Sequence, residues 1–493
     1  MLRRIRITLA ALFFVAATLL FLDFTGTVHL WLGWVAKVQF LPALLALNIT
    51  VVIVLVLLTF LFGRIYCSVI CPLGVMQDIF GWLGKKSKKN RYNYSKAISW
   101  LRYGVLAVFV VCMVAGVGVI VQLLAPYSSY GRITSTLLQP LYMWGNNGLA
   151  SIAEHYDSYA FYTVDVWMKG IITFGIAATT FVVLGVLAWR NGRTYCNTIC
   201  PVGTVLGFFS RFSLFRPVID TTKCNGCGLC TRNCKAACID SKQHTIDCSR
   251  CVACMDCIGK CRQNAISYTM KRSTKPSVAS DNSKVESPAR RDFLSLTALF
   301  AMMSVRAQEK KVDGGLAAIA DKKIPERSTR IVPPGAQGLR NMERHCTGCQ
   351  LCVSVCPNRV LRPSGSLMNL MQPECSYERG YCRPECTKCS EVCPTGAIHR
   401  IDKAEKSAIQ IGHAVWIKDN CISATDGVVC GNCARHCPVG AIQMIIPDEQ
   451  EDFAAIPSVD TERCIGCGAC ENLCPSRPFS AIYVEGHERH RIV

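Results

Sequence analysis

The hydrophobic positions of this chain are concentrated in its first 200 residues, where four long apolar stretches alternate with polar segments. Each stretch is long enough to cross a bilayer as a helix, and the last three contain no charged residue. The four predicted transmembrane helices cover residues 7–22, 41–62, 103–125 and 170–189. Arginines precede the first stretch and no small-residue cleavage site follows it, so we expect a retained signal anchor.

Basic residues fix the expected orientation of these helices. Lys and Arg are frequent between the second and third stretches and directly after the fourth, which predicts that both segments are cytoplasmic. Residues 126–169 are poor in Lys and Arg and rich in Tyr and Trp, which predicts an outer loop with an aromatic belt. We attribute the formal charge of +20 to membrane topology and to attraction of acidic electron carriers, and we expect no nucleic-acid partner.

One motif occurs twice in this apolar region. Residues 63–74 (GRIYCSVICPLG) match residues 192–203 (GRTYCNTICPVG), and each copy follows an even-numbered stretch. The duplication predicts two helix hairpins related by an axis along the membrane normal, with four cysteines at one depth near the cytoplasmic surface. We expect the C-x3-C spacing to place both sulfurs of a copy on one helix face. The four cysteines, called the thiol quartet below, are Cys67, Cys71, Cys196 and Cys200.

Four converging thiols can bind a metal or a cluster, form redox-active pairs, or pack as small apolar side chains. Packing alone would not require the same sequence frame twice, so the thiol quartet is a candidate reactive site. Cys112 lies in the middle of the third apolar stretch and is instead expected to fill the core.

Two cysteine runs of the form C-x2-C-x2-C-x3-C follow the apolar region. This spacing supplies three ligands of one [4Fe–4S] cluster and the fourth ligand of its neighbour, whereas zinc sites rarely use it. The exchange predicts the Cys224 set (Cys224, Cys227, Cys230 and Cys261) and the Cys251 set (Cys251, Cys254, Cys257 and Cys234). Lys235 and Arg262 stand where bacterial ferredoxins usually have Pro, and their charge should raise the reduction potential. Cys238 and Cys248 are left over.

Residues 271–289 are rich in Ser, Lys and Pro, and we predict a flexible linker there. Residues 290–307 begin with twin arginines, followed by Phe-Leu and an apolar run, which resembles a twin-arginine export signal in mid-chain. A short buried helix after two arginines is the alternative. Export would make this segment a signal or a short fifth span, and would place residues 308–493 outside the cytoplasmic membrane.

Four more cysteine motifs, each ending in Cys-Pro, predict a larger cluster domain in residues 308–493. The apolar residues that follow the motifs, such as 394–398 and 438–442, predict short strands of ferredoxin-like units. The two middle motifs have irregular spacing, and Cys375 could replace Cys382. The same exchange predicts the Cys346 set (Cys346, Cys349, Cys352 and Cys393), the Cys382 set (Cys382, Cys386, Cys389 and Cys356), the Cys421 set (Cys421, Cys430, Cys433 and Cys474) and the Cys464 set (Cys464, Cys467, Cys470 and Cys437).

Together these patterns predict a membrane α-helical protein, with four spans and a short fifth, that carries α+β ferredoxin-like multi-cluster domains. We expect residues 1–215 to form the membrane domain and residues 216–270 a cytoplasmic two-cluster domain. The predicted cofactors are six [4Fe–4S] clusters, and the thiol quartet could hold an additional metal or cluster. Most of the 32 cysteines are therefore expected to bind iron rather than to form disulfides.

The repeated YCxxICPxG motif, the four spans and the two-cluster unit of residues 1–270 resemble the NapH-type membrane subunit of quinol dehydrogenases. Related membrane parts occur in the nitrous-oxide reductase regulator and in the CcoG copper-reducing proteins. Residues 290–485 are similar to the NapG-type periplasmic ferredoxin, so the chain resembles a natural fusion of two subunits. The resemblance implies oxidation of quinol from the quinone pool at the bacterial cytoplasmic membrane, and electron delivery to a periplasmic reductase or cytochrome.

An electron conduit coupled to the quinone pool is the leading hypothesis. One alternative is a metal reductase that reduces an ion such as Cu(II) at the thiol quartet, although such an enzyme would not obviously need an exported four-cluster domain. Another is an electron donor for the maturation of a different redox enzyme. His29 and His155, both predicted outside, are candidates to handle quinone protons, ahead of the outer-loop acids Glu154, Asp157 and Asp165.

Overall fold

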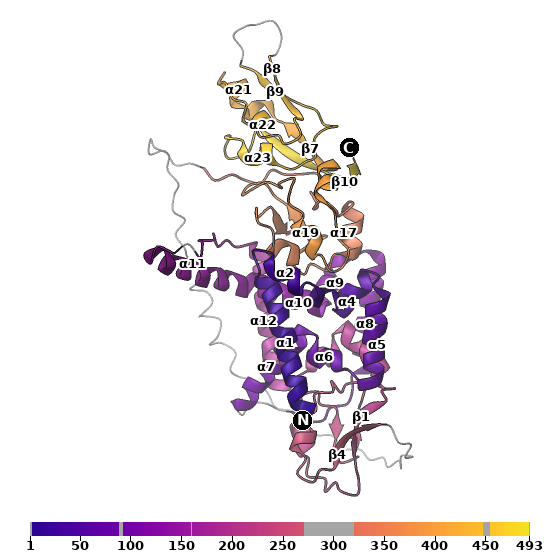
Figure 1. Ribbon diagram of the computed structural model, residues 1–493. Coiled ribbons are helices and arrows are strands. Elements are labelled where there is room, and N and C mark those ends of the chain that lie inside the picture. The colour runs from indigo at the N-terminus through magenta and orange to yellow at the C-terminus, as the bar shows by residue number, and fades with distance from the viewer. Residues whose placement is uncertain (1, 88–91, 159, 271–319, 447–453, 493) are drawn as a thin grey trace, which may run out of the picture.

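The computed structural model describes residues 2–87, 92–158, 160–270, 320–446 and 454–492 (Figure 1). The whole of the predicted linker, residues 271–289, and the whole of the predicted twin-arginine segment, residues 290–307, lie outside these residues. A helical body forms the middle of the molecule, residues 215–270 lie at the end near the N-terminus, and residues 320–492 lie at the opposite end (Figure 1).

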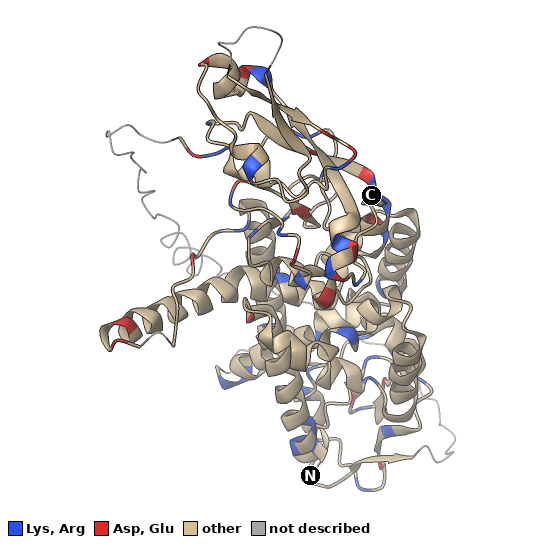
Figure 2. Ribbon diagram, turned by 45° about the horizontal axis from the view of Figure 1, so that its top comes forward, with Lys and Arg blue, Asp and Glu red and all other residues tan. Residues whose placement is uncertain are grey.

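Two helices of the body are long and apolar enough to cross a membrane. They are α1 (Leu2–Leu22) and α12 (Ile171–Asn191), each of 21 residues, and they correspond to the first and fourth predicted spans. Figure 2 shows that the helices of the body are largely free of charged residues, whereas charges are frequent in the two end domains.

The second and third predicted spans are each broken in two. Residues 41–62 divide into α4 (Phe40–Leu45) and α5 (Ile49–Phe62), because Asn48 caps α5 by accepting a hydrogen bond from Val51 N. Residues 103–125 divide into α8 (Ser99–Ala115) and α9 (Gly118–Leu124) at Gly116, which adopts a left-handed conformation with φ of 77°. The apolar pattern predicted these regions correctly as helical, but it did not reveal the breaks.

The predicted outer loop is largely helical rather than irregular. It contains α10 (Pro126–Ile133), the π-helical segment η1 (Thr134–Leu138) and α11 (Gln139–His155). Figure 1 shows α11 extending sideways from the helical body. Tyr127 and Tyr130 are buried in the core, so they are not part of an exposed aromatic belt, whereas Tyr142 and Trp144 on α11 are exposed.

Short helices complete the body. Those between α1 and α5 are α2 (Thr27–Leu32) and α3 (Trp34–Lys37). The repeated motif forms the pairs α6 (Ile65–Val69) with α7 (Pro72–Lys86), and α13 (Thr194–Thr198) with α14 (Pro201–Ser210). The two members of the repeat thus have the same helix, break and helix order, as the duplicated sequence predicts.

The end domain at residues 215–270 is closed by one antiparallel strand pair. Strand β1 (Phe215–Ile219) continues directly from the body and pairs with β4 (Ile266–Met270), so both ends of the domain are held together. The elements between them are α15 (Leu229–Arg232), β2 (Ile239–Asp240), β3 (Thr245–Ile246) and the 3-10 turn η2 (Ile258–Lys260). Strands β2 and β3 form a second antiparallel pair.

The opposite end domain has three antiparallel strand pairs among its described residues. They join β5 (Leu361–Pro363) to β6 (Pro373–Cys375), β7 (Ile409–Trp416) to β10 (Ile482–Ile492), and β8 (Ile442–Ile445) to β9 (Ile456–Val459). The short helices are α17 (Leu339–His345), α18 (Leu351–Ser354), α19 (Lys388–Val392), α20 (Lys403–Ala408), η3 (Lys418–Asn420), α21 (Ile422–Thr425), α22 (Asn432–Arg435) and α23 (Ala469–Leu473). The strand expected at 438–442 begins at Ile442, but residues 394–398 form no strand.

Candidate iron–sulfur sites and the thiols between them

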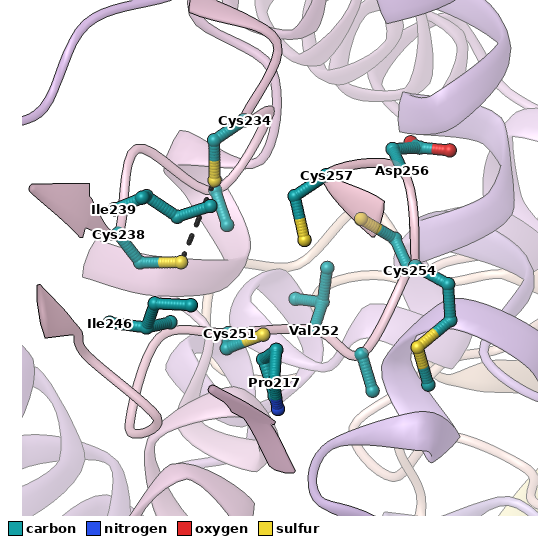
Figure 3. Close-up of a pocket in the computed structure, with 13 residues that line it drawn as sticks. Pro217, Cys234, Cys238, Ile239, Ile246, Cys251, Val252, Cys254, Asp256 and Cys257 are labelled. Carbon is teal, nitrogen blue, oxygen red and sulfur yellow. Dashed lines mark hydrogen bonds between the residues drawn. The ribbon is translucent and has the colours of Figure 1, made fainter. Parts of the chain in front are cut away.

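The Cys251 set surrounds one hollow in the end domain at residues 215–270 (Figure 3). Cys251, Cys254 and Cys257 lie on the loop before η2, and Cys234 reaches the same hollow from the end of α15. The space is about 410 Å³ and its other lining is mainly apolar. Cys238, which the spacing left without a role, also lines it, and its sulfur lies 3.6 Å from the sulfur of Cys234.

The Cys224 set surrounds a second hollow in the same domain. All four of its cysteines line a space of about 400 Å³, including Cys261 from beyond η2. The exchange of the fourth cysteine between neighbouring motifs, which the spacing predicted, is therefore the arrangement that brings these side chains together. Cys227 is exposed, so this hollow lies at the surface of the domain.

The Cys382 set surrounds a third hollow in the opposite end domain. It measures about 390 Å³ and is lined by Cys356 together with Cys382, Cys386 and Cys389. Cys375, at the end of β6, lines the same space and is 3% exposed. Both candidates for the first ligand of this set are thus present, and Cys382 remains the predicted one.

The Cys346 set is brought together between α18 and α19. Burial raises the pKa of Cys349 to about 12, and the neighbouring thiol of Cys393 adds to this effect. Burial also raises the pKa of Cys352, with contributions from Cys349, Cys346, Cys393 and Cys389. The thiols of the set are therefore close enough to influence one another, and Cys389 of the Cys382 set lies near them.

The two remaining sets lie at the end of the molecule that is farther from the helical body. Burial raises the pKa of Cys467 to about 12, reinforced by Cys464 and Cys437. Burial likewise raises the pKa of Cys433 to about 11, reinforced by Cys430 and Cys474. Cys421 belongs to the same buried cluster of side chains as Cys474.

These residues fit [4Fe–4S] clusters better than single metal ions. Three hollows at separate sites have nearly equal volumes, of about 410, 390 and 400 Å³, and cysteines surround each. Within the described ranges, no three His, Cys, Asp or Glu side chains converge closely enough to hold one ion. Cysteine binds a metal centre as the thiolate, so binding of a cluster displaces the thiol protons. The predicted ligand sets themselves stay predictions.

The thiol quartet lies inside the helical body, but not with each pair on one helix. Cys67 lies on α6, whereas Cys71 caps the start of α7, and Cys196 and Cys200 stand in the same relation to α13 and α14. The expectation of one helix face was wrong because Pro at the first position of α7 and of α14 starts a new helix. All four cysteines are buried in one core cluster. The thiols of Cys67, Cys71 and Cys196 lie close enough to the thiol of Cys200 to interact with it electrostatically.

Two buried arginines cross between the copies of the motif. Arg193 of the second copy donates a hydrogen bond from Nη1 to the carbonyl oxygen of Cys67, at 2.6 Å. Arg64 of the first copy donates from Nη2 to the carbonyl oxygen of Cys196, at 3.0 Å. Nη2 of Arg64 also lies 3.8 Å from the sulfur of Cys67. Each copy thus holds the cysteine loop of the other and places a cation beside the thiols.

The same arginines connect the thiol quartet to the Cys251 set. Nη1 of Arg64 donates to the carbonyl oxygen of Ser249, two residues before Cys251, at 3.2 Å. The backbone N–H of Arg193 donates to the carbonyl oxygen of Lys235, next to Cys234, at 2.7 Å. The side chain of Lys235 is buried and lies 2.8 Å from Asp78 and 3.1 Å from Asp256. Lys235 therefore joins the end domain to α7, and two carboxylates offset its charge.

The other face of the body carries the Cys346 set. The loop of Cys349 lies directly on α10, where a Cβ atom on Gly131 would come within 2.5 Å of the carbonyl oxygen of Cys349. Further contacts are Gln139 Nε2 to Ser354 O at 3.4 Å and Lys388 Nζ to Thr25 O at 2.7 Å. Asp165, an outer-loop acid considered for quinone protons, forms an ion pair with Arg359 at 2.9 Å. His29 lies 3.6 Å from Asp23.

Sequence reasoning missed a buried polar layer between the thiol quartet and the Cys346 set. Arg132 on α10 is 1% exposed and donates from Nη1 to Gln122 O at 2.8 Å. Tyr195, next to Cys196, donates from its hydroxyl to Leu124 O at 3.0 Å. The sequence offered one signal, because an arginine and several hydroxyl residues follow Pro126 in an otherwise apolar region.

Similar proteins agree with these sites. The profile of a 4Fe-4S binding domain matches residues 44–90 and 171–219, which contain the whole thiol quartet. A 4Fe-4S dicluster domain matches residues 427–477, and another 4Fe-4S binding domain matches residues 342–362. No solved structure shows significant similarity to the chain.

Among curated proteins, the methylamine utilization ferredoxin-type protein MauM of Methylorubrum extorquens is 31% identical over 204 residues, which are 39% of this chain and 86% of MauM. The chain belongs to this family of ferredoxin-type proteins. The ferredoxin-type protein NapF of Escherichia coli K12 is 28% identical over 181 residues, which are 36% of this chain and 99% of NapF. This ferredoxin-type protein is therefore an iron–sulfur electron-transfer protein, and it works with redox partners. The matches do not establish the NapH and NapG fusion.

Proposed function

We propose that this ferredoxin-type protein carries electrons across the bacterial cytoplasmic membrane, from the quinol pool to a periplasmic reductase or cytochrome. One observation carries the proposal. Cysteine sets lie at both ends of an apolar helical body, and the thiol quartet lies between them inside that body (Figure 1). A soluble ferredoxin has no need of such a body between its cluster domains.

The distribution of charge supports this placement. Arg3 and Arg6 begin α1 at the same end as the Cys224 and Cys251 sets, and Nε of Arg3 lies 2.8 Å from Asp256. Basic residues at this end favour the cytoplasmic side. In the proposed orientation, residues 216–289 are cytoplasmic and residues 308–493 are periplasmic, with multiple helices in the lipid. The resemblance to NapH-type and NapG-type subunits points the same way.

The contacts between neighbouring sets support a continuous path. In the outer domain, the backbone N–H of Cys382 donates to the carbonyl oxygen of Cys467, at 2.9 Å. The thiol of Cys389 in the Cys382 set lies close enough to Cys352 of the Cys346 set to add to the rise that burial causes in the pKa of Cys352. On the inner side, Arg64 and Arg193 connect the Cys251 set with the thiol quartet. Bound [4Fe–4S] clusters supply one-electron transfer, and the chain holds them in sequence and keeps water from the buried sets.

Burial of the thiol quartet favours a relay over a copper-reducing site. Cys67 and Cys200 are 4% exposed, and Cys71 and Cys196 are 5% exposed. A metal ion that is reduced and released needs an entry path, and burial of all four thiols does not favour one. The match of a 4Fe-4S binding domain to this region supports an iron–sulfur or thiol relay there.

Reconstitution tests this function. The purified full chain, inserted into phosphatidylcholine vesicles, would be mixed anaerobically with a menaquinol analogue and examined by electron paramagnetic resonance. We expect signals of reduced clusters that match part of the signal produced by dithionite. Spectra that stay unchanged on quinol addition, while dithionite reduces the same sample, would remove the quinol pool as the donor.

A further inference from the structure

An open cleft lies between α1 and α7, at the end of the helical body that meets the Cys251 set. The two helices lie side by side, and the cleft, which is open to the surroundings, spans about 1490 Å³. Its wall is apolar and includes Ile7 and Phe14 from α1 and Ile79 from α7. Ile7 is 42% exposed and Ile79 is 41% exposed, so this wall faces the surroundings of the body, where lipid would lie.

The end of the cleft that is nearer to the Cys251 set is charged. Lys85, Lys235 and Asp256 lie there, and Lys85 donates a hydrogen bond to Asn233. Cations outnumber anions among the lining residues by five to two. Arg6 also lines this part and is 8% exposed, with Nη1 bound to Asp78 at 3.0 Å. Its buried Nε–H has no hydrogen-bond partner among the described residues, so it is available to a ligand oxygen.

One residue belongs both to this cleft and to the Cys251 set. Asp256 lines the cleft and also the hollow of the set, because it stands between Cys254 and Cys257 in the loop. In Figure 3 its carboxylate points away from the cysteines. Lys235 follows Cys234 and reaches into the same cleft. A molecule in the charged end of the cleft is therefore separated from the Cys251 set only by the loop itself.

We propose that this cleft binds the quinol, with its isoprenoid tail along the apolar wall and its ring at the charged end beside Arg6. The inference rests on the proposed function and gives it a site. Arg6 Nε–H would donate to one ring oxygen, and the excess of cations would favour the loss of protons from the ring hydroxyls. The outer residues His29 and His155 are then not needed for quinol protons.

The reaction at this site balances with groups already named. Oxidation of one quinol breaks its two O–H bonds, releases two protons to water at the cytoplasmic mouth, and yields one quinone and two electrons. The Cys251 and Cys224 sets would each hold one oxidised [4Fe–4S] cluster, and each cluster would accept one of the two electrons. The two-cluster domain thus has the capacity for both electrons of one quinol.

An anionic lipid is the other molecule that an apolar wall and a cationic floor can attract. The contact of the charged end with the loop of the Cys251 set favours quinol, because a structural lipid gains nothing from a place beside a redox centre. Lipid binding would also not depend on a planar ring next to Arg6. Competition between the two molecules is therefore part of the test.

Photolabelling tests the site without relying on turnover. An azidoquinone with a short isoprenoid tail would be photolysed with the full chain in phosphatidylcholine vesicles, and labelled peptides would be mapped by mass spectrometry. We expect label on α1 or α7, reduced about tenfold in Ile79→Trp, which narrows the cleft at its apolar wall. Ile53→Trp on α5 is the matched control, since Ile53 is 51% exposed outside the cleft, and it should label normally.

The outcomes distinguish failure of the site from failure of the proposed function. Label on other helices, or equal label in Ile79→Trp, would overturn the site, and so would label that phosphatidylglycerol displaces but a quinol analogue does not. Quinol-driven reduction of the clusters should also fall about tenfold in Ile79→Trp, while dithionite reduction stays complete. If quinol reduces wild-type and Ile79→Trp equally, this site is wrong and the proposed function stands. If quinol fails to reduce even the wild type, the proposed function itself is wrong.

Discussion

A Cβ atom on Gly74 would lie 2.6 Å from Nη1 of Arg193, so the glycine of one motif copy leaves the space that the arginine of the other copy occupies. The relation is mirrored, because a Cβ atom on Gly203 would lie 2.7 Å from Nη2 of Arg64. This explains why each copy has Arg at its second position and Gly at its end. The two copies fold as an interlocked pair around the thiol quartet.

Replacing Gly74 by Ala should destabilise the helical body. The new Cβ would lie 2.3 Å from the carbonyl oxygen of Cys67, and overpacking of this kind costs about 1–3 kcal/mol. Thermal unfolding in detergent measures the effect. Gly175→Ala is the matched control, since it lies on α12 with nothing within 4 Å, and it should be neutral or stabilise by about 0.5–1 kcal/mol. Equal stability of both variants would contradict the interlock.

The choice between Cys375 and Cys382 can be decided by iron analysis. Cys382→Ser should lose the cluster of that set and lower the iron and acid-labile sulfide content by about one sixth, given six predicted clusters. Cys375→Ser changes a cysteine that lines the same hollow and should keep the full content. The reverse pattern would make Cys375 the ligand.

Replacing Cys67 and Cys196 by Ser should slow electron transfer between the two end domains. Serine keeps the packing but removes the thiol, so all six cysteine sets should still load iron. Stopped-flow measurements with quinol should then show fast reduction of the inner sets, and reduction of the outer sets slowed by about tenfold or more, equivalent to about 1.4 kcal/mol of barrier. Cys112→Ser, on α8 outside the quartet, is the control. An unchanged rate in the double variant would exclude the quartet from the path.

His490 on β10 should make the outer domain sensitive to acid. Burial, and then the charge of His487, lower the pKa of His490 from 6.5 to about 4. Between these values the unfolded chain takes up a proton that the folded chain rejects, so stability is complete above pH 6.5 and falls as the pH drops toward 4. At pH 5 the loss is about 2 kcal/mol.

Melting temperatures at pH 7 and pH 5 check this prediction. His490→Gln should reduce the difference between the two values, whereas His399→Gln, at an exposed histidine, should leave it unchanged. If His490→Gln melts with the same pH dependence as the wild type, then His490 does not cause the acid sensitivity.

The spacing of the cysteines carried more information than the hydropathy of the helices around them. That spacing is set by the geometry of a cubane, so it predicted shared sets, and in the structure Cys234 and Cys251 line one hollow and Cys224 and Cys261 line another. Hydropathy identified apolar helices but not their breaks, because the turns at Asn48 and Gly116 depend on single capping residues inside apolar runs.

The side-chain contacts that cross the helical body could not be predicted. Nothing in the spacing of the motif shows that Arg64 and Arg193 reach across to the opposite copy, since each hydrogen bond joins residues more than 120 positions apart. Composition assigns the aromatic residues after Pro126 to a surface belt, but Tyr127 is buried near Cys349 and Tyr130 is buried against Phe14 and Phe21 of α1. Only the packing of residues 320–492 on α10 distinguishes buried aromatic residues from an exposed aromatic belt.

The order of the cysteine sets along the helical body has an energetic consequence. With the chain placed across a membrane as proposed, an electron that leaves the inner domain for the outer domain moves through the transmembrane voltage. Each elementary charge is worth about 2.3 kcal/mol per 100 mV. A cytoplasm at negative voltage would therefore push electrons outward and lower the midpoint-potential difference that the acceptor must provide, so the energised state of the cell would help to set the direction of flow.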